Sequence, residues 1–305
     1  MTMSNWGRRQ SVLAVLFFML ALKPALAVAE VLEVGHIRPD VGEDQRSDYF
    51  LELLDAALAA SSETFGPYRL VEAPVQMTQS RAMHEMGRDE YVHVIWTMTS
   101  TDRETELRPV RIPLLRGLLG VRAAVVPAGQ AARLEGVDTL ETLSELIPGQ
   151  GHDWPDTAIL RANGIRVETA SSYEGLFRML VRGRIDYIPR SVAEVWGERS
   201  MYQRHDLVIA DHFLLAYTAP IYFFVAADNS ALAERLEYGL NRLIESGEFR
   251  HRFETHPANR EAIERFFANP RPIIWLNNPD LPEETPLDVA ELWFEPVFRH
   301  HEVGD

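Results

Sequence analysis

Residues 165–189 read IRVETASSYEGLFRMLVRGRIDYIP, and this stretch contains a strand, a helix and a second strand. We expect the strands at 165–169 and 185–189 and the helix at 171–183, where Gly183 ends it. Strands that alternate with helices form βαβ units, whose strands lie parallel in one sheet. The stretch therefore predicts an α/β fold.

The same alternation continues on both sides of this stretch. A strand is expected at 31–37 and a helix at 47–66, where apolar residues recur at helical spacing. A strand at 219–228 leads into another helix, which carries four leucines on one face, Leu232, Leu236, Leu240 and Leu243. The chain therefore consists of two series of α/β units.

We expect the two series to form two lobes, each a mostly parallel sheet flanked by helices. The first lobe would comprise residues 30–124 and 218–305, including a Pro-rich C-terminal strap at about 269–305. Residues 125–217 would form the second lobe, inserted into the first.

The first 27 residues have the composition of an export signal. Arg8 and Arg9 precede the apolar run SVLAVLFFMLAL, and the sequence ALA follows at a suitable cleavage point. A membrane anchor would need ~20 apolar residues, and Lys23 interrupts this run too early. We expect cleavage after Ala27 or Ala29 and a periplasmic protein.

The composition excludes several kinds of partner and site. The formal net charge is −15, which disfavours nucleic acid and anionic lipid as partners. The chain has no cysteine, so disulfides, thiolate metal sites and cysteine nucleophiles are all excluded. Any anion-binding site must therefore be a local basic pocket within an acidic protein.

The segment TMTSTDRETEL at 97–107 is the first candidate site. Capping of a short helix by Thr99, Ser100 or Thr101 accounts for the hydroxyls. Capping does not account for Arg103, because a cation is mildly unfavourable in a first helical turn. The hydroxyls, Thr97 included, and Arg103 could instead form part of a site for an anionic group.

Two further places offer candidate ligand contacts. Trp96 ends the strand before this segment, where it could stack on a ligand or pack in the core. The segment GQGHDW at 149–154 contains Gln150, Gly151 and His152 and precedes a helix. Its glycines would let backbone amides converge on an anion at the helix N-terminus. The alternative is a plain turn.

Four segments resemble the type II periplasmic solute-binding proteins, in particular the family that captures polar amino acids for ABC importers. These segments are TMTSTDRETELRPVRIPLLRGLLGVRAAVV, IPGQGHDWPDTAIL, SSYEGLFRMLVRGRIDYIP and IYFFVAADNSALAERLEYGLNRLIESGEF, and the resemblance covers residues 31–268. It implies two hinged lobes that close over a small ligand and deliver it to a membrane permease. It also implies that Arg103 grips the ligand's carboxylate, with Thr97, Thr99 and Ser100 as further donors.

The chain departs from this family at two places. The acid that usually pairs with a ligand's ammonium is replaced by Arg190-Ser191, and His36 stands where aromatic residues are expected. Arg103 and Arg190 facing one cleft would suit a dicarboxylate or an acidic peptide fragment. The alternative is that Arg190 pairs with Glu194, one helical turn on.

Two other functions compete with solute capture. Some proteins of this scaffold dehydrate small acids, but the chain has no His-Glu-x-x-His, Gly-x-Ser-x-Gly or phosphate-binding loop. We therefore expect no catalytic residue, no metal and no cofactor. A periplasmic sensing module, with a sensor kinase as partner in place of a permease, remains the second alternative. We expect a monomer in either case.

Overall fold

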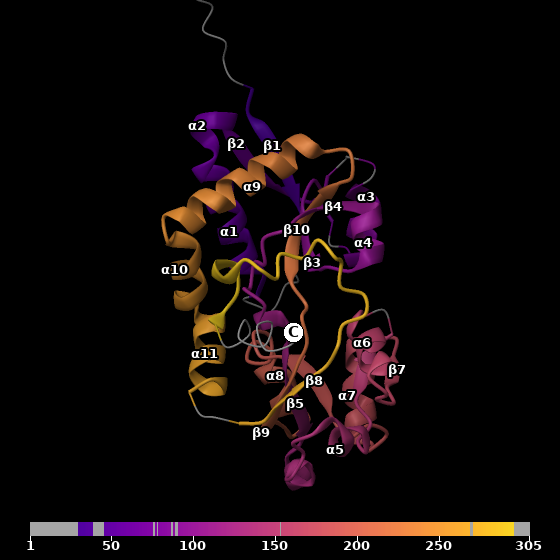
Figure 1. The fold of residues 1–305 in the computed structure, drawn as a ribbon. Coiled ribbons are helices and arrows are strands. Elements are labelled where there is room, and N and C mark those ends of the chain that lie inside the picture. The colour runs from indigo at the N-terminus through magenta and orange to yellow at the C-terminus, as the bar shows by residue number, and fades with distance from the viewer. Residues whose placement is uncertain are drawn as a thin grey trace, which may run out of the picture.

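The computed structural model describes residues 30–38, 46–75, 77, 79–86, 88, 91–152, 154–268 and 271–295. These residues form two lobes, one above the other, joined by a narrow middle region (Figure 1). The predicted export signal at 1–27 lies outside the described residues. No helix in the described part of the chain is long and apolar enough to cross a membrane.

The upper lobe contains one mixed sheet. Its strands are β1 (Leu32–His36), β2 (Tyr68–Glu72), β3 (Ile95–Met98), β4 (Leu107–Val110) and β10 (Ile221–Ala226). A bridge from His36 to Val94 joins β1 to β3, which gives the order β2-β1-β3-β10-β4. The pair β1-β2 is parallel, whereas β10 runs antiparallel to both of its neighbours.

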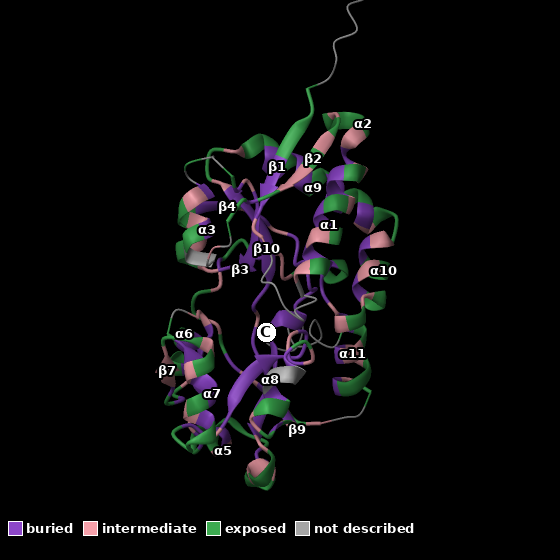
Figure 2. Ribbon diagram, turned by 180° about the vertical axis from the view of Figure 1, so that it is seen from behind, coloured by how far each residue is buried: buried purple, intermediate pink, exposed green. Residues whose placement is uncertain are grey.

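Helices cover the two faces of the upper sheet unequally. Helices α1 (Arg46–Ala60) and α9 (Ser230–Glu245) pack together on one face, and α3 (Gln79–Met86) lies on the other. The short helices α2 (Ser62–Phe65) and α4 (Thr101–Glu106) follow α1 and β3. The four leucines predicted for one face of α9 are all buried. Figure 2 shows buried strands such as β10 in the interior and exposed residues on the helices around them.

The lower lobe contains a second mixed sheet of the order β7-β6-β8-β5-β9-β11. Its strands are β5 (Val121–Pro127), β6 (Gly149–Gly151), β7 (Glu168–Ala170), β8 (Ile188–Ser191), β9 (Leu207–Ala216) and β11 (Ile273–Trp275). Its helices are α5 (Leu140–Ser144), α6 (Asp156–Ala162), α7 (Tyr173–Val181) and α8 (Arg199–Arg204). Short 3₁₀ segments occur at Leu118–Gly120, Ala128–Leu134 and Ala290–Leu292.

Two of the parallel strands are those predicted from the βαβ pattern. Strands β7 and β8 flank α7 and lie parallel in one sheet, with β6 between them. Strand β5 is antiparallel to both β8 and β9, because the chain enters and leaves the lower lobe along β5 and β9. The segment at 191–198, which follows β8, consists mainly of turns.

The C-terminal part of the chain contacts both lobes. Helices α10 (Glu248–Thr255) and α11 (Pro257–Phe266) descend from α9 along one side of the molecule (Figure 1). Residues 271–295, which we call the strap, then add β11 to the lower sheet beside β9. The strap returns to the upper lobe, where the Asp280 carbonyl accepts a hydrogen bond from the Thr101 amide at 3.1 Å. The tail was expected in the first lobe, but its strand belongs to the lower sheet.

Candidate functional site

The upper lobe places Arg103 at the carboxyl end of β3. Ser100 is the N-cap of α4, and its Oγ accepts a hydrogen bond from the Arg103 amide at 3.3 Å. Helix capping therefore explains Ser100. The Arg103 side chain folds back onto the strand, where Nη1 donates to Thr97 Oγ1 at 2.8 Å and to the Met98 carbonyl at 2.5 Å. These two bonds fix the guanidinium at the edge of the upper lobe.

The neighbouring candidates have structural contacts of their own. Thr99 Oγ1 donates to Glu104 Oε1 at 2.6 Å, and Arg111 holds the other oxygen of Glu104. The Trp96 ring lies against Phe50 at 5.5 Å between centroids and is buried in the core. His36 is also buried, with Nδ1 at 2.9 Å from the Ile37 carbonyl.

The lower lobe holds Arg190 in a buried ionic network. Its guanidinium forms two hydrogen bonds to Glu198, at 3.1 and 2.5 Å, and lies 3.1 Å from Glu194. The rings of Trp154 and Tyr173 lie against it, at 5.0 and 5.6 Å. The structure thus shows the pairing with Glu194 that was the alternative to ligand contact, and it adds Glu198 as a second partner.

A second buried arginine completes this network. Arg122 on β5 lies 2.7 Å from Asp156 at the start of α6 and 3.6 Å from Glu194. The hydroxyl of Tyr217 donates to the same Asp156. Three carboxylates therefore face two guanidiniums, and the network carries no surplus positive charge.

Acidic neighbours keep both of these arginines charged. Burial acts to lower the pKa of Arg190, but Glu194 and Glu198 outweigh burial and hold that pKa well above its ordinary value. The pKa of Arg122 is also raised, because Asp156 and Glu194 overcome the effect of its burial.

Gly149–Gly151 of the segment GQGHDW form strand β6, and the two described amides that follow the strand have acceptors within the chain. The amide of His152 donates to Ala170 at 3.1 Å, and that of Trp154 donates to Gly151 at 3.2 Å. A Cβ on Gly151 would lie 2.6 Å from the Trp154 ring, so this glycine permits close packing. The expectation of an amide cradle is therefore wrong for these two amides.

Two predicted residues of the lower lobe are fully buried. Gln150 lies on β6, and in the part of the chain that the structure describes neither its Nε2 nor its Oε1 has a hydrogen-bond partner. Ser191 ends β8, and its Oγ lies 3.4 Å from the Leu118 carbonyl. His152, in contrast, is exposed.

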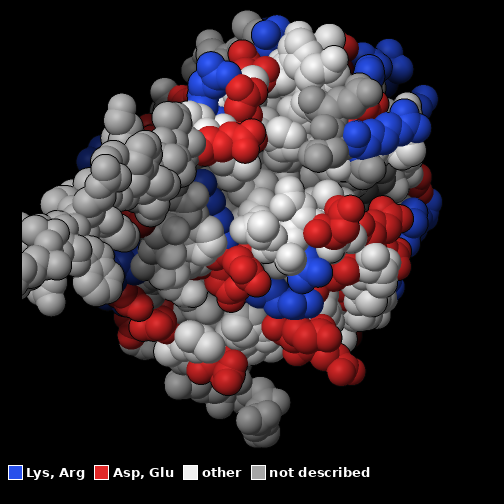
Figure 3. Space-filling model, turned by 90° about the horizontal axis from the view of Figure 1, so that it is seen from above, with Lys and Arg blue, Asp and Glu red and all other residues white. Residues whose placement is uncertain are grey.

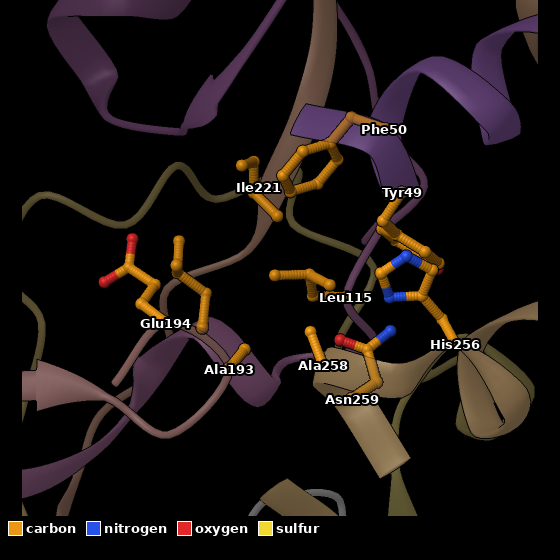
Figure 4. A pocket seen from close by; sticks show the side chains of 10 residues that line it. Tyr49, Phe50, Leu115, Ala193, Glu194, Ile221, His256, Ala258 and Asn259 are labelled. Carbon is orange, nitrogen blue, oxygen red and sulfur yellow. The ribbon is translucent and has the colours of Figure 1, made fainter. Parts of the chain in front are cut away.

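A pocket between the lobes lies among residues that the sequence did not single out as a site. Its empty space measures about 370 Å³, part of which is open solvent. Its lining is Tyr49, Phe50, Leu115, Leu119, Ala193, Glu194, Ile221, His256, Ala258 and Asn259 (Figure 4). These residues come from five separate stretches of the chain, so no local motif points to the pocket. The only local signal is Pro257, which marks the start of α11 after His256.

Charge on the outer surface is mixed. Figure 3 shows acidic and basic side chains interspersed over the top of the upper lobe. Among the described residues seen on this face, basic side chains form no broad patch. Within the described residues, no group of three or more His, Asp or Glu side chains is arranged to hold a metal ion.

No family model and no curated protein sequence matches the chain. Solved structures match it in fold. An ancestral arginine-binding protein bound to arginine has a TM-score of 0.51 and 16% identity, over 73% of this chain and 96% of that one. A Salmonella typhimurium periplasmic binding protein of high arginine specificity has a TM-score of 0.51 and 15% identity, over 74% and 98%.

A third match is the periplasmic VFT2 domain of BvgS from Bordetella pertussis. Its TM-score is 0.51 and its identity 16%, over 73% of this chain and 92% of that domain. At such identities the likeness is one of fold. Together with the two sheets, it shows that this chain has the two-lobed fold of the type II periplasmic solute-binding proteins.

Proposed function

We propose that this protein captures a small carboxylate-bearing solute between its two lobes and delivers it to an ABC-type importer. The observation that carries the proposal is the position of Arg103, whose guanidinium is held at the lobe edge by Thr97 and the Met98 carbonyl. A guanidinium presents a planar fork that matches a carboxylate. Thr99 and Ser100, on the same segment, would line the upper wall beside it.

The balance of charges in the lower lobe favours a ligand with one carboxylate over a dicarboxylate. A second anionic end would need an uncompensated cation, and Arg190 already faces two carboxylates. Gln150 is the lower-lobe candidate best suited to a polar contact, because its buried amide has no hydrogen-bond partner among the described residues. Gly151, His152 and Ser191 would contribute the surrounding wall.

The remaining candidates would shape the upper wall without holding charge. Trp96 and His36 are buried beside the lobe edge and would act through packing. The export-signal composition of residues 1–27 supports a periplasmic location. The net charge of −15 supports a small-molecule ligand in preference to nucleic acid. We propose that the protein acts as a monomer and without catalysis or cofactor.

Calorimetric titration with amino acids and organic acids tests the capture of a carboxylate. The wild-type protein should bind at least one carboxylate, and Arg103→Gln should weaken that binding by about 10- to 100-fold, since a charged hydrogen bond is lost. Arg108→Gln, at an exposed position of β4, is the matched control and should keep wild-type affinity. Equal affinity in the wild type and Arg103→Gln would refute the assignment of Arg103.

Delivery to an importer is tested separately in cells. Cells that lack the protein should lose uptake of the carboxylate identified by titration, and the wild-type gene should restore it. If uptake is unchanged while binding is intact, the protein is a sensing module, and its partner should be sought among sensor kinases.

A further inference from the structure

The pocket between the lobes lies on the opposite side of the upper sheet from Arg103. Arg103 bonds to Thr97, which pairs with Tyr222 on the face that α3 covers. The pocket is lined by Phe50 and Ile221, which lie on the α1 side of the same sheet. The two places therefore lie on opposite faces of this sheet.

Most of the pocket wall is apolar, but one end carries two buried polar atoms that have no hydrogen-bond partner among the described residues. These atoms are Nδ1 of His256 and Nδ2 of Asn259, and Asn259 is only 1% exposed. In Figure 4 both side chains lie at the end of the pocket opposite Glu194. A buried amide without a partner is costly, and native proteins keep one mainly where a ligand or water satisfies it.

The same end of the pocket is the N-terminus of α11, a helix of 10 residues. Its first helical hydrogen bond runs from the Arg260 amide to the His256 carbonyl. The amides of Ala258 and Asn259 precede that bond and so have no acceptor within the helix. Exposed amides and the helix dipole together favour an anion at this position.

Charged groups on the adjacent elements complete the environment. Glu194 forms the far end of the pocket, where Arg122 and Arg190 compensate its charge. Asp48 and Glu52 on α1 lie near His256, but burial outweighs them and lowers the pKa of its imidazole. The ring is therefore neutral at pH 7. In the tautomer that carries its proton on Nδ1, that nitrogen can donate a hydrogen bond to an acceptor in the pocket.

We propose that this pocket is a second binding site, which takes a small carboxylate with a short apolar body. The Asn259 amide, the amides of α11 and His256 would hold the carboxylate. The apolar body would lie against Leu115, Ile221 and Phe50. This site goes beyond the proposed solute capture at Arg103 and does not depend on it.

Titration of the full-length protein with 3-methylbutanoate tests the proposal, with the uncharged 3-methylbutanamide as the matched probe. The carboxylate should bind at least tenfold more tightly than the amide. Asn259→Leu should weaken carboxylate binding at least tenfold while keeping or raising the melting temperature, because it replaces an unpartnered buried amide by an apolar group of similar size. Arg242→Gln, exposed on α9, should bind like the wild type.

A second variant provides the same test if Asn259→Leu does not fold. Ala258→Leu fills the pocket without changing its polar groups and should also weaken binding of 3-methylbutanoate at least tenfold. The proposal is overturned if the wild type binds neither probe, if both probes bind equally, or if both variants keep wild-type affinity. It is also overturned if Arg103→Gln weakens this binding, because the probe would then occupy the other site.

Discussion

At the scale of single residues, the buried network around Arg190 is the feature that most changes the interpretation of the sequence. The arginine looked like a ligand contact because it replaces an acid, yet it is fully engaged with Glu194 and Glu198. Removing Glu198 takes away the two oxygens to which the Arg190 guanidinium donates, which leaves buried donors without an acceptor. The network therefore contributes to the stability of the lower lobe.

We expect Glu198→Gln to lower the free energy of unfolding by about 3 kcal/mol, measured by urea titration. The matched control is Glu245→Gln, which removes an exposed pair with Arg242 and should cost under about 0.5 kcal/mol. A loss at Glu198 no larger than that at Glu245 would show that the buried pair contributes little.

The burial of His256 leads to a prediction about how the stability of the protein depends on pH. Burial lowers the pKa of His256 below its ordinary 6.5 in the folded protein, so the unfolded chain takes up the proton first as the pH falls. The titration of His256 therefore reduces the free energy of unfolding of the protein as the pH falls from about 7 to 5. His256→Gln should lose less stability than the wild type over that interval, measured by urea midpoints at both pH values. An identical loss in both proteins would contradict the prediction.

At the scale of elements, the contact between α1 and α9 depends on Gly239. A Cβ at this position would lie 1.9 Å from the Ala57 carbonyl oxygen, so only glycine allows the two helices to approach so closely.

We expect Gly239→Ala to destabilise the fold by about 1–3 kcal/mol, even though alanine is the better helix former. Gly129→Ala is the control, because nothing lies within 4 Å of its added Cβ. The control should change unfolding free energy by less than about 0.5 kcal/mol. A stabilised Gly239→Ala protein would mean that α1 and α9 can separate at no cost.

The strap is the element that ties the lobes together outside the hinge strands. Asn163 and Asn277 form two hydrogen bonds, at 2.7 and 2.9 Å, at the lower end of the strap. Near its C-terminal end, the Trp293 carbonyl accepts from Arg116 at 2.6 Å, and the indole of Trp293 is 1% exposed. Opening of the lobes must therefore strain or release the strap.

Trp293→Ala should cost about 3–5 kcal/mol, because it removes a large buried ring. Thermal or urea unfolding of the variant measures this loss. A loss below about 1 kcal/mol would mean that the end of the strap detaches readily from the body of the protein.

The elements that the sequence predicted best are those with long periodic patterns. The helix expected at 47–66 is α1 followed by α2, and the leucines of α9 are buried as expected. Strand β11 was missed because it has three residues in a Pro-rich tail and is defined by pairing with β9.

At the scale of the whole molecule, the two-lobed architecture was predictable because repeated βαβ units leave few ways to build a sheet. The site was predictable only in part. Ser100 and Arg103 belong to one local segment, so their contact could be inferred from the sequence. Glu198 pairs with Arg190 from eight residues away across a series of turns, and no periodic pattern indicates such a contact.

The most direct test of the central claim is a crystal structure of the protein with the carboxylate that titration identifies. We predict a ligand between the lobes, with its carboxylate within hydrogen-bonding distance of the Arg103 guanidinium and with the lower lobe closed over it. A carboxylate bound away from Arg103, with that side chain still confined to Thr97 and Met98, would contradict the account.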